Sequence, residues 1–173
     1  IDGGQRAVLL LKASAIMRRD PHAGSDGSYL IRSLYFDDLN DTCFRQNEAG
    51  TDPRAKYRVR YYDDLSFIRL EKKIKRRGLT EKVSCLLSPE EAERLTAGVI
   101  PEVRGDMPAE KRSLLWEMAS RGMMPKVIVT YRRIPFVYTA GNVRVTFDEG
   151  ITSSDETDSF LTGDFRPGAG VLP

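Results

Sequence analysis

The sequence predicts an α+β protein in which an antiparallel β-sheet carries a cationic face and helices lie at its margins. Residues 54–62 (R-A-K-Y-R-V-R-Y-Y) place a cation at every second position, so a strand would turn all four cations to one face. Residues 67–75 (F-I-R-L-E-K-K-I-K) repeat this alternation. Residues 88–91 (S-P-E-E) combine a Ser N-cap, a Pro at the first helical position and a Glu at the third, which favours a helix start.

The first half of the chain divides at its glycines and polar loops. Residues 5–19 are rich in Ala and Leu and end with two arginines, as expected near the C-terminus of a helix. Residues 29–36 (Y-L-I-R-S-L-Y-F) are rich in aromatic and β-branched residues and predict a strand, followed by a polar segment with room for a helical turn. The two basic strands come next, and Gly78 marks the turn into a third strand over residues 79–87.

Two helices are expected in the second half. The helix that starts at residue 88 is short and should end before Gly98. Residues 108–121 predict a second helix that stops at Gly122. The side chains that we expect to face the core from this second helix are Leu114, Leu115, Trp116 and Met118.

The last strands extend the cationic face. Residues 126–133 end in two arginines, and residues 143–147 alternate Arg144 and Thr146 with apolar side chains. These two strands could form a hairpin, because a Gly-Asn pair lies between them. Residues 149–173 read as a polar tail without a core-forming pattern.

Positive charge is concentrated in one segment. Residues 54–82 hold eleven Lys or Arg against four Asp or Glu, whereas the formal net charge of the whole chain is only +2. A charged strand face is often just a solvated surface. Two consecutive strands with cations on a shared face repel each other, however, and such a surface favours a strongly anionic ligand.

Several functional classes find little support. The two cysteines, Cys43 and Cys85, belong to no metal-ligating cluster, and two free thiols fit a reducing cytoplasm. The only histidine, His22, lies in a loop-like segment, so nucleophilic catalysis by a Ser/His or Cys/His pair is poorly supported. No stretch approaches the length of a membrane span. The chain begins without Met and is expected to be a fragment of a longer protein.

A closed sheet would gather these cations in one lumen. If the strands turn their charged faces inward, a barrel of about eight strands leaves room for side chains or one small ligand. Arg binds phosphate through two parallel hydrogen bonds, and Lys acts as a point charge. Cations around an extended ligand therefore describe a tunnel for a polyanion.

Six segments resemble, in their order along the chain, the vacuolar transporter chaperone (VTC) domain, the polyphosphate polymerase branch of the triphosphate tunnel metalloenzymes. They are S-L-Y-F-D-D (33–38), R-x-K-x-R-x-R-x-Y (54–62), L-E-K-K-I-K (70–75), Lys82, Y-R-R-I-P-F (131–136) and V-R-V-T-F-D (143–148). The resemblance implies an eight-stranded antiparallel tunnel. It also implies ATP-dependent synthesis of inorganic polyphosphate, with Mn²⁺ or Mg²⁺ bound to the triphosphate. The first and last strands of that family have no counterpart here, so residues 1–173 are expected to form a single tunnel domain, incomplete at both ends.

The resemblance also implies the roles of individual residues. The side chains expected to clamp the triphosphate are Arg58, Arg60, Lys73, Arg133 and Arg144, with Lys56 and Lys82 as further phosphate-binding groups. We expect them to converge on one concave face of the sheet. For metal binding, Glu71 and Asp148 are the available carboxylates, and an ion pair with a neighbouring cation is the alternative role for Glu71.

Other functions of the same tunnel stay open. A hydrolase could cleave inorganic triphosphate or an RNA 5′-triphosphate, since only the acceptor differs. A non-catalytic module could bind polyphosphate or RNA through counterion release. Nucleic acid is the less favoured partner, because Tyr57 and Tyr61 lie opposite the cations and could not stack on bases there.

Overall fold

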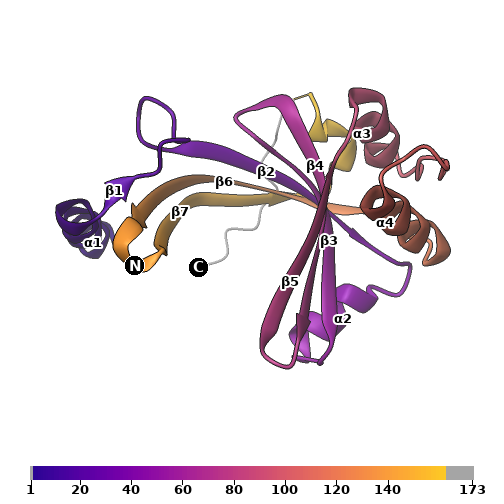
Figure 1. Cartoon of the computed structure of the whole chain (residues 1–173), viewed down its shortest axis with the longest axis horizontal. Coiled ribbons are helices and arrows are strands. Elements are labelled where there is room, and N and C mark those ends of the chain that lie inside the picture. The colour runs from indigo at the N-terminus through magenta and orange to yellow at the C-terminus, as the bar shows by residue number, and fades with distance from the viewer. Residues whose placement is uncertain (1, 163–173) are drawn as a thin grey trace.

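The computed structural model describes residues 2–162 and shows one strongly curled antiparallel sheet with helices on its outside (Figure 1). The sheet order is β1-β6-β2-β3-β4-β5, and β7 pairs with β6. The strands are β1 (Arg18–Arg19), β2 (Tyr29–Asp37), β3 (Arg54–Tyr62), β4 (Asp64–Arg76), β5 (Leu79–Leu86), β6 (Met124–Tyr138) and β7 (Val143–Ser154). The helices are α1 (Gly3–Ile16), α2 (Thr42–Glu48), α3 (Pro89–Thr96) and α4 (Ala109–Ser120), with short 3₁₀ turns η1 (Thr139–Gly141) and η2 (Thr157–Phe160).

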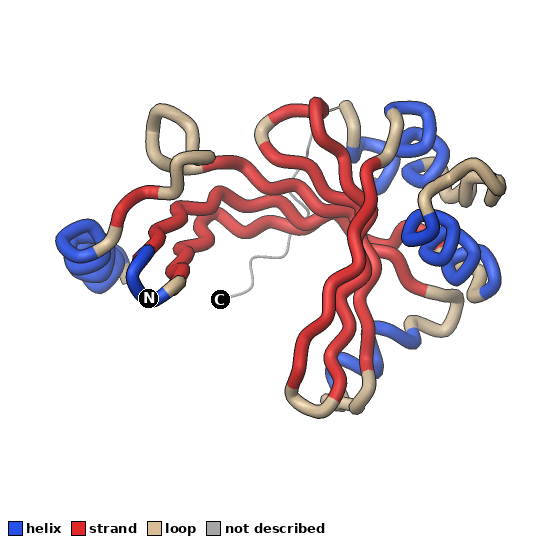
Figure 2. The backbone as a smooth tube through the Cα atoms, viewed as in Figure 1, coloured by secondary structure: helices blue, strands red, loops and turns tan. Residues whose placement is uncertain are grey.

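The sheet forms two arms. One arm consists of β1, β6, β7 and the start of β2, and the other consists of β3, β4 and β5 with α2 beside them (Figure 1). Figure 2 shows how the strands twist where the arms cross, so that an open angle remains between the arms. This half-barrel confirms the expected α+β fold. Within residues 2–162 the sheet is not closed, because β5 and β7 each pair on one side only.

The core lies on the face of the sheet that α3 and α4 cover. Leu34, Val59 and Leu70 from the strands pack there with Leu95 of α3 and Leu115 of α4, and all five are fully buried. A smaller hydrophobic cluster packs α1 against strand β6. It includes Ala13 of α1 and Ile134 and Phe136 of β6. The cationic side chains that alternate with the buried core residues along β3 and β4 are therefore left on the uncovered face.

Helix boundaries follow the local signals with one exception. The predicted start of α3 is confirmed, since the Ser88 hydroxyl accepts a hydrogen bond from the Glu91 backbone N–H and the Glu91 side chain accepts one from the Ser88 N–H. The first helix was expected to include Arg18 and Arg19, and this was wrong. Their backbone groups pair with β6 as strand β1, which ends α1 at Ile16.

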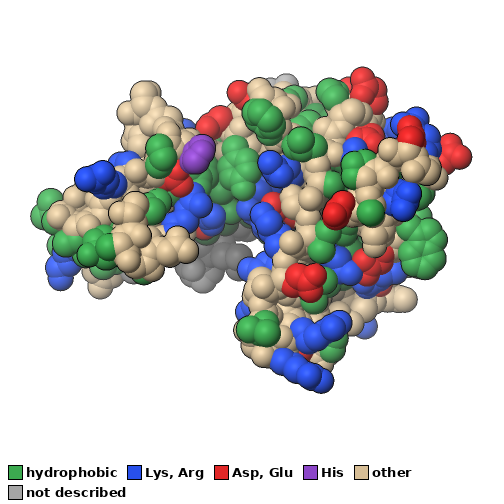
Figure 3. Space-filling view, in the orientation of Figure 1, with side chains coloured by type: hydrophobic (Ala, Val, Ile, Leu, Met, Phe, Trp, Pro, Cys, Tyr) green, Lys and Arg blue, Asp and Glu red, His purple; other side chains and the backbone are tan. Residues whose placement is uncertain are grey.

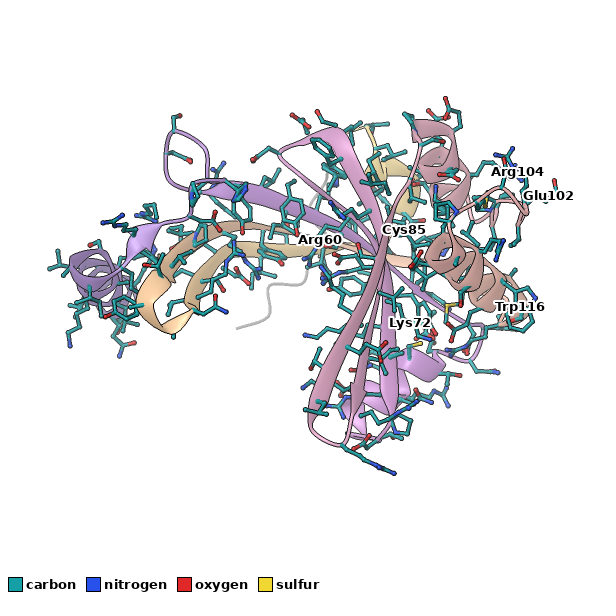
Figure 4. The ribbon with its side chains drawn as sticks, in the orientation of Figure 1. Arg60, Lys72, Cys85, Glu102, Arg104 and Trp116 are labelled. Carbon is teal, nitrogen blue, oxygen red and sulfur yellow. The ribbon has the colours of Figure 1, made fainter. Side chains whose placement is uncertain are left out.

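Trp116 was expected to face the core, and this was wrong. Its side chain is 65% exposed and points away from the sheet at the outer surface of α4 (Figure 4). The expectation for Leu114, Leu115 and Met118 is confirmed, because all three are buried. These three positions lie on one side of the helix at 3.6 residues per turn, and Trp116 falls outside that stripe.

The last hairpin is longer than predicted. Strand β6 continues past Pro135, which would normally end a strand because proline lacks an N–H donor. On this side of β6, Arg133 is the last residue that pairs with β2, and Phe136 is the first residue that pairs with β1. Pro135 therefore lies between the two pairings. Proline is tolerated at this gap between the two neighbouring strands.

Part of the segment expected to be a polar tail belongs to the folded domain. Residues 149–154 continue β7, and η2 then places Phe160 in the core against the ring of Tyr61, at 5.2 Å between ring centroids. Phe160 is 0% exposed. The rest of the expected tail, residues 163–173, lies outside the described residues. None of the helices in residues 2–162 is long and apolar enough to cross a membrane.

We expect Phe160→Ala to lower the free energy of unfolding by about 3–5 kcal/mol, because it opens a cavity in the core. Phe44→Ala is the matched control: Phe44 is 63% exposed on α2, and its loss should change stability by less than about 0.5 kcal/mol. Urea denaturation followed by circular dichroism measures both values. Equal effects of the two substitutions would contradict the placement of η2 in the core.

Candidate functional site

The register of β3, β4 and β5 places the predicted cations on one face in rows across the strands. Arg54 lies opposite Lys75, and Arg60 lies opposite Arg69. One row between them consists of Lys56, Lys73 and Lys82, and the other of Arg58, Glu71 and Ser84. We call this side of the sheet the cationic face. Figure 3 shows Lys and Arg side chains along the hollow between the two arms.

Glu71 is the only acidic residue in these rows, and it is 2% exposed. Its Oε2 accepts a hydrogen bond from Arg58 Nε at 2.8 Å and forms an ion pair with Arg58 Nη2 at 2.7 Å, and its Oε1 accepts a hydrogen bond from Lys82 Nζ at 3.1 Å. Burial raises the pKa of Glu71, but the charge and hydrogen bonds of Arg58 and Lys82 outweigh burial and leave that pKa below its usual value. Of the two roles considered for Glu71, the structure shows the ion pair.

Lys56 and Lys73 face each other without an acidic partner among the described residues. They line a cavity of about 240 Å³ together with Tyr35, Arg54 and Lys75. No Asp or Glu of residues 2–162 lines this cavity. Like charges that face each other on neighbouring strands destabilise a sheet, so an anion bound here would relieve a repulsion that the protein carries.

Arg60 lies deeper, near the crossing of the two arms (Figure 4), and is 6% exposed. Its Nε donates to the Ser33 hydroxyl at 2.9 Å, and its other nitrogens donate to the hydroxyls of Tyr62 at 3.5 Å and Tyr131 at 3.3 Å. It makes no ion pair with another described residue. The hydrogen bonds of this buried guanidinium go to neutral hydroxyls, so a ligand anion could take the place of a direct counter-ion.

Tyrosine hydroxyls join Arg60 to the cations of the other arm. The Tyr131 hydroxyl also accepts from Arg133, whose guanidinium binds Asp148 at 2.6 and 2.7 Å. The hydrogen bond to Asp148 raises the pKa of Arg133 above its usual value. Arg144 donates to the Tyr29 hydroxyl at 3.1 Å.

The carboxylate of Asp20 completes this end of the site. It accepts a hydrogen bond from Arg144 and contacts the exposed His22, through its backbone N–H and its Nδ1, both at 2.9 Å. The bond from the His22 backbone, together with Arg144, lowers the pKa of Asp20. The five residues expected to clamp phosphate therefore lie on one face. Arg60 and Arg133 share the Tyr131 hydroxyl, Arg144 contacts Tyr29 on the same arm as Arg133, and Arg58 and Lys73 lie in the adjacent rows of β3 and β4.

The described carboxylates do not fit a resident metal ion. Glu71 on β4 and Asp148 on β7 are separated in the sheet by β3, β2 and β6, and each is held by Arg or Lys. No group of three His, Cys, Asp or Glu side chains in residues 2–162 could share a cation. The roles proposed for Glu71 and Asp148 as metal ligands thus gain no support from their geometry.

Sequence reasoning overlooked the hydroxyl groups of the cationic face. Ser33 and Tyr35 lie two residues apart on β2 and therefore point to the same face. They are the cross-strand partners of Arg60 and Arg58 on β3, and their hydroxyls accept hydrogen bonds from these arginines. This alternation could have been read from residues 29–36. The same alternation on β2 places an aromatic side chain on the cationic face. Tyr57 and Tyr61 do lie opposite the cations, but other tyrosines, among them Tyr35, lie beside them.

We expect Glu71→Gln to lower the free energy of unfolding at neutral pH by about 3 kcal/mol, because Arg58 and Lys82 lose their counter-charge. The folded-state pKa of Glu71 lies below its unfolded value of about 4.5, so its contribution is present above that pH and is lost as the pH falls. Urea denaturation between pH 7 and pH 3 should show the two proteins converging at acid pH.

Glu81→Gln is the control, since Glu81 is exposed on β5 and forms no ion pair within residues 2–162. Its stability should follow that of the parent across the whole pH range. A Glu71→Gln protein as stable as the parent at pH 7 would contradict the importance of the ion pair.

Solved structures share this fold at low sequence identity. A putative adenylyl cyclase from Hippeastrum, described as having a dominant triphosphatase activity, has a TM-score of 0.56 and 16% identity over 86% of this chain and 68% of its own. A putative adenylate cyclase from Bacillus halodurans has a TM-score of 0.55 and 12% identity, over 94% of this chain and 81% of its own. Both likenesses concern the fold alone.

Comparison with curated proteins gives no significant sequence match. The family model of the VTC domain, in contrast, matches residues 6–171. This match includes every strand of the half-barrel and all the residues of the cationic face. Because the match spans almost the whole chain, the chain belongs to the VTC domain family.

Proposed function

We propose that this domain is an ATP-dependent polyphosphate polymerase, which transfers a phosphoryl group to a growing polyphosphate chain on the cationic face. The observation that carries the proposal is that Arg60 and the facing pair Lys56 and Lys73 form no ion pair with a carboxylate of residues 2–162. A ligand rich in phosphate supplies the negative charge that these groups lack. Family membership supports chemistry on triphosphate or polyphosphate.

Positioning and charge neutralisation would provide the catalysis. In phosphoryl transfer the protein need not form a covalent bond to the substrate. Its main role is to hold the attacking and leaving oxygens in line. In the proposal, Arg58 and Arg60 grip the transferred group through their planar forks, Lys73 neutralises its charge, and Arg133 and Arg144 bind the phosphates on the other arm. Lys56 and Lys82 add further charge.

A divalent ion would enter as part of the substrate. Mn²⁺ or Mg²⁺ bound to the phosphate oxygens of ATP neutralises charge on the nucleotide and needs few protein ligands. This agrees with the lack of a metal-binding cluster in residues 2–162. The reaction releases ADP and lengthens the polyphosphate chain by one phosphate.

Hydrolysis of triphosphate is the second candidate function. The structural neighbour from Hippeastrum is described as having a dominant triphosphatase activity. The same cations would bind the triphosphate in either reaction, and water would replace the terminal oxygen of the polyphosphate chain as the acceptor. The two functions therefore differ in product rather than in the residues that bind the substrate.

Tripolyphosphate at low salt should raise the melting temperature of the full-length protein, because only the folded sheet gathers the cations. We expect Lys73→Met to lower the affinity about tenfold, through the lost charge-assisted contact. Without ligand the same variant should be slightly more stable than the parent, because the repulsion from Lys56 and Lys82 is removed.

Differential scanning fluorimetry and titration calorimetry measure both effects. Lys12→Met is the control, since Lys12 is exposed on α1, far from the cationic face. The affinity should also fall steeply between 50 and 300 mM salt, to an extent of about tenfold or more. An unchanged melting temperature at millimolar tripolyphosphate would refute a phosphate site.

Incubation of the full-length protein with ATP and Mn²⁺ should produce long polyphosphate, detectable by gel electrophoresis. Arg60→Ala should reduce the rate by about 10²–10³, since a preorganised donor to the transferred group is lost. Arg104→Ala provides the control, because Arg104 lies in the exposed loop before α4 and should leave the rate unchanged (Figure 4). Release of free phosphate without polymer would favour the triphosphatase, and full activity of Arg60→Ala would reject the assigned site.

A further inference from the structure

An aromatic side chain ends the row of cations on β3. Arg54, Lys56, Arg58 and Arg60 occupy successive same-face positions, and Tyr62 occupies the next one. Same-face neighbours on a strand are about 6.6 Å apart, so the Tyr62 ring begins about 13 Å along the strand from Arg58. The side chain of Tyr62 is 38% exposed.

The ring of Tyr62 is held in place. It makes an edge contact with the ring of Tyr29, at 5.5 Å between centroids and an interplanar angle of 77°. The guanidinium of Arg60 lies 5.8 Å from the Tyr62 centroid and donates to its hydroxyl. The ring is therefore ordered by the residues of the phosphate site, and part of it stays open to a ligand.

The two ends of the row differ in charge as well as in shape. Two carboxylates, Asp63 and Asp64, follow Tyr62 directly, and both are exposed. At the other end, Lys73 and Lys75 line the cavity of about 240 Å³, which has no acidic residue of the described chain in its wall. The Tyr62 end of this row therefore combines an aromatic surface with carboxylates, whereas the charged side chains that line the cavity at the Lys75 end are all cations.

We propose that Tyr62 is the stacking platform for the base of the nucleotide. This inference rests on the proposed function, because it orients ATP in the same site. A nucleoside triphosphate has a flat ring system at one end and its charge at the other, which matches the asymmetry of the row. With the base on Tyr62, the triphosphate runs past Arg60 to Arg58, beside Arg133, which shares the Tyr131 hydroxyl with Arg60, and the transferred phosphate lies between these guanidinium groups and Lys73. The polyphosphate product then extends toward Lys75.

Stacking on an aromatic ring contributes about five- to 100-fold in affinity per base, with little preference among bases. Tyr62 is only partly exposed and one of its edges already contacts Tyr29, so we expect the lower end of that range. Tripolyphosphate lacks the base and provides a probe that uses the same cations without Tyr62.

The test compares dissociation constants of ATP and tripolyphosphate for the full-length protein and its variants, by titration calorimetry with Mg²⁺. Tyr62→Ala should weaken ATP binding about five- to tenfold and change tripolyphosphate binding less than twofold. Tyr62→Phe keeps the ring and should bind ATP like the parent. Tyr62→Leu keeps an apolar contact with Tyr29 but no aromatic face, and should behave like Tyr62→Ala even if the latter folds poorly.

Tyr138→Ala is the matched control, because Tyr138 is exposed at the end of β6 away from the cation row. Unchanged ATP binding in Tyr62→Ala and Tyr62→Leu would overturn the inference. An equal loss for both ligands would overturn it as well, and would assign Tyr62 to the support of Arg60. If tripolyphosphate does not bind the parent, the proposed function fails and the inference fails with it; if it binds normally, only the role of Tyr62 is at stake.

Discussion

Repulsion between the cations of β3 and β4 is the constraint on which the rest of the structure depends. Like charges face each other across these strands at several positions, Lys56 and Lys73 among them, and only Glu71 interrupts them with a negative charge. The opposite face of the same strands must supply the attraction. Val59 and Leu70, which are direct cross-strand partners on that face, are both fully buried in the core. The two strands thus repel each other through the cations on one face and are held together by apolar packing on the other face.

Helix α4 reinforces the sheet from behind at this place. Tyr57 and Lys72 are cross-strand partners, and both bind the carboxylate of Glu117, at 2.6 Å from the tyrosine hydroxyl and 2.6–2.7 Å from the lysine. Burial raises the pKa of Glu117, but these two partners outweigh burial and keep the pKa below its usual value. One carboxylate of α4 therefore joins β3 to β4 and opposes their separation.

Local periodicity predicted the cationic face correctly, because alternation in a strand depends only on neighbouring residues. Contacts between distant segments could not be read in this way. The counter-ion of Arg144 is Asp20, which lies 124 residues away in the chain and reaches it only through the pairing of β1 with β6. The burial of Phe160 was missed for a related reason. A single apolar residue in a polar segment shows no hydrophobic periodicity, and its burial depends on the fold of the whole sheet.

Hydroxyl groups rather than a carboxylate hold Arg60, and they shape the path of any anion that passes it. A carboxylate partner would lose an ion pair when an anion arrived and regain it when the anion left. Hydroxyls carry no net charge and rotate to donate or accept, so Ser33, Tyr62 and Tyr131 can stay in contact with the guanidinium throughout. The partners of Arg60 then need little rearrangement between occupied and empty states. Under the proposed function, a string of phosphates that slides past Arg60 would meet a shallow energy profile, in which no single position becomes a trap.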